Sequence, residues 1–209
     1  SFGVKDKIIL SALSKYRGAW RRMEYKGELR ITNNELSKEK SRNNRPVIHN
    51  LQFIIPVYDD YAHHPTEIKA TLAAFRSANP LSPILCVFQP HQGKRLEVLF
   101  KEFVDSFSEA DITIIMPIYR VAGRDVKATK WNAEALAHAI QRRHPKQKVF
   151  YLEEAKNLRN ALKTLLLTFG DESCLPSVIV KIPVSRRGTP IIVMMGAGDI
   201  VNLTPKLLK

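Results

Sequence analysis

Two short segments of the chain combine histidines, carboxylates and basic side chains in a way that suits anion binding and proton transfer. The first is YDDYAHHPTE at 58–67, and the second is FQPHQGKR at 88–95. Imidazole exchanges protons near neutral pH, and guanidinium binds a carboxylate or phosphate through two parallel hydrogen bonds. These segments therefore define the candidate site. Its candidate groups are Asp59, Asp60, Tyr61, His63, His64, Glu67, His91, Gln92, Lys94 and Arg95.

Histidines beside carboxylates also raise the possibility of a metal site, because both groups ligate zinc or iron. Adjacent His63 and His64 would point in different directions, and the HxxxH spacing that puts two rings on one helix face is missing. We therefore expect no dedicated metal site. His64 precedes Pro65 at a predicted helix start, so capping is the favoured role for it. For His63 and His91, a structural and a chemical role both stay open.

Three other features have plain structural explanations beside the functional ones. Asp59 and Asp60 suit a ribose hydroxyl, an amino group or a magnesium-bound water, but paired aspartates also cap loops. Arg95 could capture a small carboxylate, or it could lie in a solvated first helical turn. The run Gly196-Ala197-Gly198 lacks the third glycine of a dinucleotide loop, so we expect a tight strand-to-helix turn there.

From residue 52 onward, short apolar runs alternate with stretches of helical period, which predicts an α/β fold. The expected architecture is a doubly wound, mostly parallel, Rossmann-like sheet with helices on both faces. The predicted strands are 53–58, 84–88, 112–116, 148–152 and 190–195. The predicted helices are 65–78, 96–107, 131–143 and 153–169. Because ligands bind at the carboxyl ends of parallel strands, the two polar segments should meet at one edge of the sheet.

Two stretches stand outside this alternation. Residues 1–17 read as a short amphipathic helix without a partner in the α/β unit, and we expect it to be the end of a preceding domain. Residues 24–50 contain the strand EYKGELRI followed by a polar segment, which predicts a hairpin with a long exposed loop.

Composition limits the classes of partner. The 209 residues are 44% hydrophobic and carry a net charge of +13, which favours anionic partners of any kind without selecting one. No apolar run approaches the roughly 18 residues of a membrane span, and the first residues lack the features of a signal peptide. We therefore expect a cytoplasmic protein. Cys86 lies in the apolar run ILCVF and is expected to be a buried, reduced thiol.

Five segments together resemble one known family. They are GAWRRMEYKGE at 18–28, DDYAHHPTEIKATLAAFR at 59–76, FQPH at 88–91, SEADITIIMPIY at 108–119 and MGAGDI at 195–200. In this order they look like the C-terminal domain of UDP-N-acetylmuramate:L-alanine ligases, of the Mur ligase superfamily. The resemblance implies that residues 1–17 are the last helix of a central ATPase domain. Residues 18–209 would form the amino-acid-binding domain, with insertions near 31–50 and 177–190.

The resemblance also implies a reaction in peptidoglycan synthesis. In that family, ATP phosphorylates the lactyl carboxylate of UDP-N-acetylmuramate, and the amine of L-alanine then attacks the acyl phosphate. By this resemblance Arg22 and Asp60 would contact the nucleotide, and Arg95 would hold the carboxylate of alanine. His63 would accept a proton from the attacking amine or orient it. The remaining residues implied to surround alanine are Tyr61, His91 and Gln92.

This chain departs from the family pattern at two places, and it lacks one motif of the complete ligases. The family usually has arginine where this chain has Gln92, and the stretch 177–190 is longer than the family's. The sequence holds no GxxxxGK[ST] phosphate loop, so we expect ATP and Mg²⁺ to be held mainly by other domains and this chain alone to be inactive.

Two alternatives stay open. A recycling ligase that attaches a whole tripeptide shares the first polar segment, although FQPH favours the alanine enzyme. A stand-alone basic module that binds nucleic acid would also explain the charge, but we do not expect nucleic acid or membrane as a partner.

Overall fold

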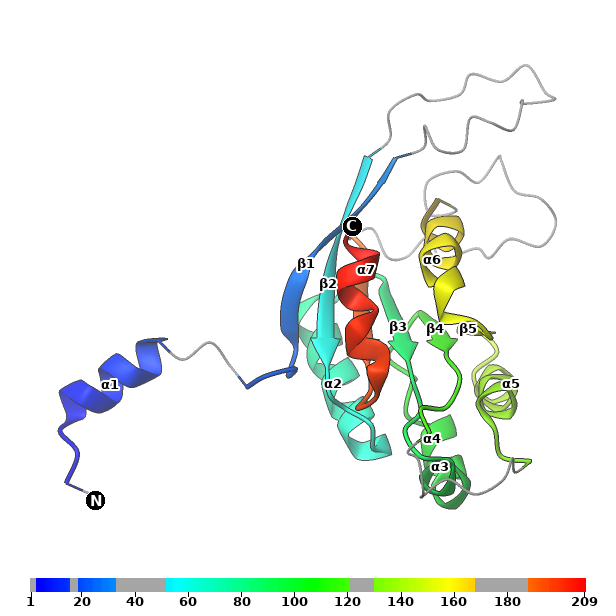
Figure 1. The fold of residues 1–209 in the computed structure, drawn as a ribbon, viewed down its shortest axis with the longest axis horizontal. Coiled ribbons are helices and arrows are strands. Elements are labelled where there is room, and N and C mark those ends of the chain that lie inside the picture. The colour runs from blue at the N-terminus through cyan, green and yellow to red at the C-terminus, as the bar shows by residue number, and fades with distance from the viewer. Residues whose placement is uncertain (1–2, 16–18, 33–51, 121–129, 168–187) are drawn as a thin grey trace.

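The computed structural model describes residues 3–15, 19–32, 52–120, 130–167 and 188–209. Its centre is a six-stranded sheet in the order β1-β2-β6-β3-β4-β5 (Figure 1). β1 runs antiparallel to β2 at one edge, and the other neighbouring strands are parallel. The strands are β1 (Glu24–Thr32), β2 (Gln52–Asp60), β3 (Ile84–Phe88), β4 (Ile112–Ile115), β5 (Lys148–Tyr151) and β6 (Ile191–Met195). All five strands predicted within the α/β unit are confirmed.

Helices cover both faces of the sheet, because the central strands alternate their side chains between two apolar cores. In β3, Cys86 and Phe88 face the core under α2 to α5, whereas Leu85 and Val87 face the core under α6 and α7. The helices are α1 (Asp6–Lys15), α2 (Pro65–Ala78), α3 (Gly93–Val98), α4 (Phe100–Val104), α5 (Ala133–Arg143), α6 (Leu158–Leu167) and α7 (Thr204–Leu207). Short 3-10 helices are η2 (Ala155–Asn157) and η3 (Asp199–Asn202). The predicted doubly wound α/β class and the buried Cys86 are confirmed.

The α2 helix begins directly after the first polar segment. His64 is its N-cap and accepts a hydrogen bond from the Thr66 N–H, while Glu67 completes a capping box and Pro65 occupies the first turn. The capping role predicted for His64 is confirmed. Burial of one face of α2 fixes the direction in which this segment leaves the sheet.

The apolar stripe predicted at 96–107 is buried, but it does not form one helix. Leu99 has φ −105° and ψ 23°, so the helix ends there and α4 starts again at Phe100. The break lets the Phe100 ring lie 4.5 Å from the ring of Trp131, while Phe103 still packs 5.9 Å from Phe88, measured between ring centroids. The apolar stripe thus packs against two different partners, Trp131 and Phe88, although its sequence has the period of a single helix.

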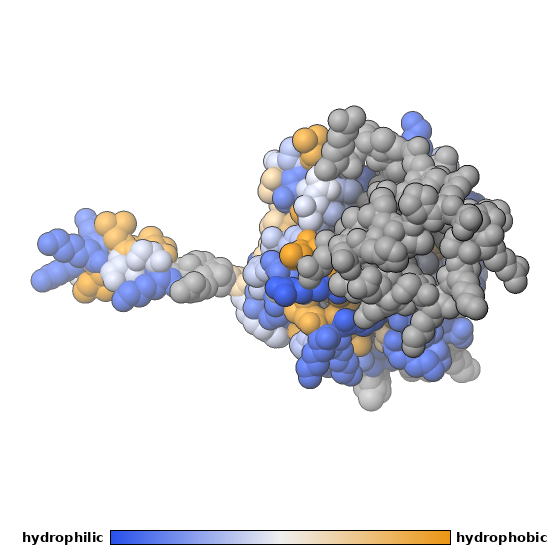
Figure 2. All heavy atoms as spheres, turned by 90° about the horizontal axis from the view of Figure 1, so that it is seen from above, coloured by the Kyte–Doolittle hydropathy of each residue, from blue (hydrophilic) through white to orange (hydrophobic). Residues whose placement is uncertain are grey.

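The stretches outside the α/β unit are described in part. β1 and β2 form the predicted antiparallel pair, but residues 33–51 between them lie outside the described residues, as do 177–187 and Cys174. The predicted helix at the start of the chain is present as α1, and none of its described residues is buried. It stands away from the sheet (Figure 1), with apolar and hydrophilic residues on its surface (Figure 2). Its assignment to a preceding domain stays a prediction.

No helix in the described ranges has the length and apolar character that crossing a membrane would require.

Candidate functional site

The two polar segments meet where the parallel strands end, as the sequence predicts. The first follows β2 and the second follows β3, and the ring centroids of His63 and His91 are 5.9 Å apart. The turn after β6 joins them, because the Gly196 N–H donates to the Asp60 carbonyl and the Gln89 N–H donates to the Met195 carbonyl. Three strand ends therefore build this edge.

Four aromatic rings form a continuous series across the site. The Tyr61 and His63 centroids are 5.0 Å apart with edge-to-face geometry, and His91 stacks on Tyr119 at 5.4 Å with 17° between the planes. The Tyr119 N–H also donates to the Pro90 carbonyl, and the Tyr119 carbonyl accepts from Gln92. Tyr119 is not among the candidate groups named from the sequence, although its place shortly after β4, at the carboxyl end of a parallel strand, is a signal that could have found it.

The lysine and the arginine of the second polar segment differ in burial and in their partners. Lys94 is exposed and pairs with Glu97 at 3.1 Å. Arg95 lies in α3, and its Nη1 is buried without a hydrogen-bond partner among the described residues. Gln92 precedes α3 in the left-handed region at φ 64°, and its side chain makes no capping bond. Arg95 is therefore the cation of this segment that remains available to an anionic ligand.

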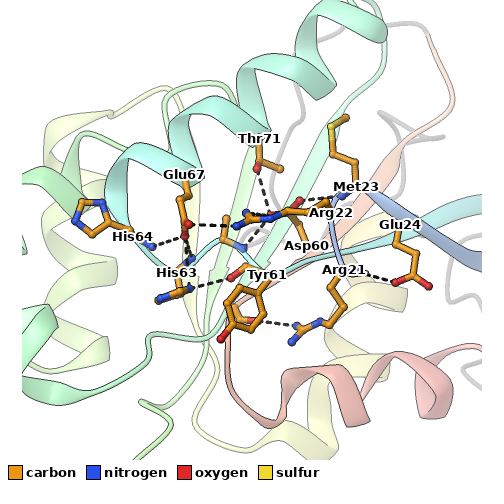
Figure 3. Close-up of polar contacts among 12 residues, drawn as sticks. Arg21, Arg22, Met23, Glu24, Asp60, Tyr61, His63, His64, Glu67 and Thr71 are labelled. Atoms are coloured by element: carbon orange, nitrogen blue, oxygen red, sulfur yellow. Dashed lines mark hydrogen bonds and ion pairs between the residues drawn. The ribbon is translucent and has the colours of Figure 1, made fainter. Parts of the chain in front are cut away.

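Asp60 organises the other end of the site (Figure 3). Its Oδ1 accepts from the Ala62 N–H at 2.8 Å and the Thr71 hydroxyl at 3.2 Å, and its Oδ2 accepts from the Met23 N–H at 2.9 Å. Arg22 Nη1 lies 3.9 Å from Oδ1, and the Arg22 side chain is 46% exposed. The buried carboxylate thus holds the loop, and the half-exposed guanidinium faces solvent. Contact of either residue with a nucleotide stays a prediction.

Glu67 joins the two ends of the site. Its Oε1 accepts from Arg22 Nη2 at 3.3 Å, and its Oε2 accepts from the backbone N–H groups of His63 at 3.0 Å and His64 at 3.3 Å. Partial burial raises the pKa of Glu67, but the His63 N–H and the Arg22 guanidinium outweigh burial, so the pKa lies below its usual value. Glu67 is therefore held as a carboxylate.

Arg21 is buried, unlike its neighbour Arg22, and the sequence carries no signal that separates them. Its Nη2 donates to the Gly196 carbonyl at 2.6 Å, and its own carbonyl accepts from the Tyr61 N–H at 2.7 Å. Burial lowers the pKa of Arg21 and raises the pKa of Asp59, which accepts a hydrogen bond from the Thr204 hydroxyl. Arg21 is thus a structural clamp between the turns that follow β2 and β6.

The two aspartates at this edge are buried and accept hydrogen bonds from the chain itself. Asp60 already accepts three hydrogen bonds from the chain, and Asp59 Oδ1 is taken by Thr204. Within the described ranges, no three histidine, cysteine or acidic side chains gather in a way that could hold a metal ion.

Comparison with known proteins places this architecture. Residues 49–172 match the family described as Mur ligase, glutamate ligase domain. The chain is 31% identical over its whole length to a UDP-N-acetylmuramate--L-alanine ligase of Clostridium beijerinckii and 33% identical to that of Clostridium perfringens. It spans 35% of the length of each. Its fold resembles that of a UDP-N-acetylmuramate-alanine ligase from Thermotoga maritima, with a TM-score of 0.58, 19% identity, and coverage of 99% of this chain and 33% of the other. The chain therefore belongs to the Mur ligase family, as a domain of the glutamate ligase type.

Proposed function

We propose that the chain is the amino-acid-binding C-terminal domain of an ATP-dependent ligase that joins L-alanine to UDP-N-acetylmuramate. The relatives named above carry this activity in their names, and their similarity extends over the whole chain. Because the chain spans about a third of their length, the proposal includes further domains in the parent protein. Residues 1–17 would belong to the central ATPase domain, and the cytoplasm is the expected compartment.

One observation carries the proposal for the site. Arg95 holds a buried Nη1 that lacks a hydrogen-bond partner among the described residues, and it lies four residues after His91 in the chain. A buried guanidinium nitrogen without a partner is costly, and a ligand carboxylate would satisfy it through a charge-assisted bond. Arg95 would therefore bind the carboxylate of alanine, and Gln92 would add a neutral hydrogen bond.

The aromatic series would then receive the rest of the amino acid. Tyr61, His63 and His91, whose rings lie within 5.9 Å of their neighbours in the series, would surround it. His63 would accept a proton from the ammonium, or orient the amine, before attack on the acyl phosphate. Holding nucleophile and proton acceptor together is the contribution that such a domain makes to the reaction.

The nucleotide would lie at the other end of the site. Arg22 would contact it, and Asp60 would hold that arginine and the loop in place. Because the sequence holds no phosphate loop and Asp60 is already bonded within the chain, Mg²⁺ and most of the ATP contacts would belong to other domains of the parent.

The deciding experiment is a ligation assay on the full-length parent with L-alanine and, separately, with the tripeptide. We expect UDP-N-acetylmuramate-dependent ADP release with alanine, and weak ATP binding without hydrolysis for the chain alone. Preference for the tripeptide would assign the chain to the recycling ligase. Submicromolar binding of DNA or RNA at physiological salt, with a steep salt dependence and no ligation, would support a nucleic-acid module instead.

A further inference from the structure

We infer that Glu67 is a positioning residue that holds the His63 imidazole in one tautomer and couples it to Arg22. The inference rests on the proposed function, because it gives His63 and Arg22 their ligands. Its basis is geometric, since one carboxylate contacts both the residue proposed to handle the proton and the residue proposed to meet the nucleotide (Figure 3).

The tautomer follows from the neighbours of His63 Nδ1. This nitrogen lies 3.0 Å from the Tyr61 carbonyl oxygen and 3.5 Å from Glu67 Oε2. Both neighbours accept hydrogen bonds and neither donates them, so the proton of the neutral ring resides on Nδ1. The lone pair is then on Nε2, which is the nitrogen left to take a proton from the amine of alanine.

The coupling follows from the two oxygens of Glu67. Oε1 is bonded to the Arg22 guanidinium, while Oε2 is bonded to the His63 N–H and lies near the His63 ring. A phosphate that drew Arg22 away would leave Oε1 without its cation and increase the negative charge beside His63. Nucleotide binding at Arg22 would therefore strengthen the attraction between the Glu67 carboxylate and the protonated Nδ1 of His63.

Helix capping is the plain alternative role for Glu67, because this side chain also completes the capping box of α2. The two roles can be separated by Glu67→Gln. Glutamine keeps an acceptor for the capping box, which tolerates either residue, but it loses the charge that faces Arg22 and His63. A pure cap would tolerate this change, whereas a positioning carboxylate would not.

The first test is ¹⁵N NMR of the histidine side chains in the chain itself. We expect wild-type His63 to be protonated on Nδ1, and Glu67→Gln to show a measurable fraction of the other tautomer, because only the Tyr61 carbonyl then still accepts the Nδ1 proton. The exposed Glu154, which pairs with Lys156, offers a matched control, and Glu154→Gln should leave the His63 signals unchanged. A wild-type ring protonated on Nε2, or an unaltered signature in Glu67→Gln, would overturn the inference.

The second test addresses the coupling. Arg22→Gln should shift the His63 ring signals in the wild-type background and leave them in place in the Glu67→Gln background. Equal shifts in both backgrounds would show that no coupling passes through Glu67.

The third test uses the full-length parent. Glu67→Gln should lower kcat for alanine ligation by about tenfold or more, at an alanine KM changed by less than about twofold. If the NMR results hold but the parent does not ligate alanine, the proposed function fails and the positioning role stands. If the parent ligates alanine and Glu67→Gln leaves kcat intact, the positioning role fails alone.

Discussion

Gly198 lies so close to Tyr119 that a Cβ atom at position 198 would fall 2.6 Å from both Cβ and Cγ of the tyrosine. The same Cβ would fall 2.7 Å from the side-chain oxygen of Gln89, which accepts from the Ile200 N–H. Because Tyr119 stacks on His91, this glycine sets the space in which the second polar segment sits. The tight turn expected at Gly196-Ala197-Gly198 is thus also a close approach between two strand ends.

Gly198→Ala should therefore lower the free energy of unfolding by about 1 to 3 kcal/mol, the usual cost of overpacking. The cost is steric, since Gly198 has φ −90°, which alanine tolerates. Urea unfolding measures it, and loss of the His91–Tyr119 ring-current shifts in NMR would locate it. Ala197→Ser, at the half-buried neighbouring position, is the control. An unchanged midpoint and unchanged His91 signals in Gly198→Ala would contradict the contact.

Arg21 and Arg22 should respond oppositely to removal of the side chain. Arg21→Ala leaves the buried Gly196 carbonyl without its donor and removes a positive charge near buried Asp59, so the free energy of unfolding should fall by about 1 to 3 kcal/mol. Arg22→Ala removes a 46% exposed side chain and should cost less than about 1 kcal/mol, while raising KM for ATP in the parent. Urea titrations of the chain and nucleotide kinetics of the parent check both halves. If Arg21→Ala and Arg22→Ala lowered the free energy of unfolding equally, the difference in burial between the two arginines would have no effect on stability, against this prediction.

Arg76 ties α2 to the opposite, amino-terminal edge of the sheet. It donates to the Ser82 carbonyl at 2.7 Å, the Glu109 carbonyl at 2.9 Å and the Asp111 carboxylate at 2.6 Å. Arg76→Ala should lower the free energy of unfolding by about 3 to 5 kcal/mol, because it removes a largely buried ion pair with Asp111 together with two hydrogen bonds to backbone carbonyls.

The matched control for that experiment is Arg143→Ala, which breaks an exposed pair with Asp105. Its cost should stay below about 1 kcal/mol. Chemical denaturation at one salt concentration compares the two variants, and a similar cost for both would refute the structural role of the buried pair.

Glu67 should make stability depend on acidic pH. Its folded pKa lies below the usual value, so its contribution is fully present above about pH 4.3 and is lost as the pH falls through the lower folded pKa. The stability difference between wild type and Glu67→Gln should therefore be larger at pH 7 than at pH 3. Glu154→Gln, at an exposed and solvent-screened pair, should differ little from wild type at either pH. If the stability difference between wild type and Glu67→Gln grew as the pH fell, it would contradict the lowered pKa of Glu67.

Arg95 and Gln92 test the carboxylate site in the full-length parent. Arg95→Ala removes a charge-assisted bond of about 1.5 to 3 kcal/mol, so KM for alanine should rise at least about tenfold. Gln92→Arg replaces a neutral bond by a charged one, a gain of about 1 kcal/mol, and should lower KM for alanine roughly fivefold with little change for ATP. Lys94→Ala, which removes an exposed cation paired with Glu97, is the control. An alanine dependence untouched by Arg95→Ala would remove this segment from the site.

Much of the fold could be predicted because its signals are local. Alternating apolar runs of four to six residues mark buried parallel strands, and the capping role of His64 follows from Pro65 and Glu67 beside it. The two polar segments could be placed at one edge, because parallel strands end on the same side. The division of the stripe at 96–107 could not be predicted, since Phe100 directly after the break contacts Trp131, which is distant in sequence.

By itself, the sequence determined the α/β class, the strands and helices of the unit, the meeting of the two polar segments at one edge and, through its motifs, the family. Only the tertiary structure decided that β6 lies between β2 and β3, which brings Gly196 within 2.6 Å of Arg21 across 175 positions of sequence. It also decided that Arg21 is buried while Arg22 is half-exposed, and that Tyr119 stacks on His91. The physical reason is that burial and side-chain contact depend on which distant segments become neighbours, and side-chain type and periodicity do not encode that order.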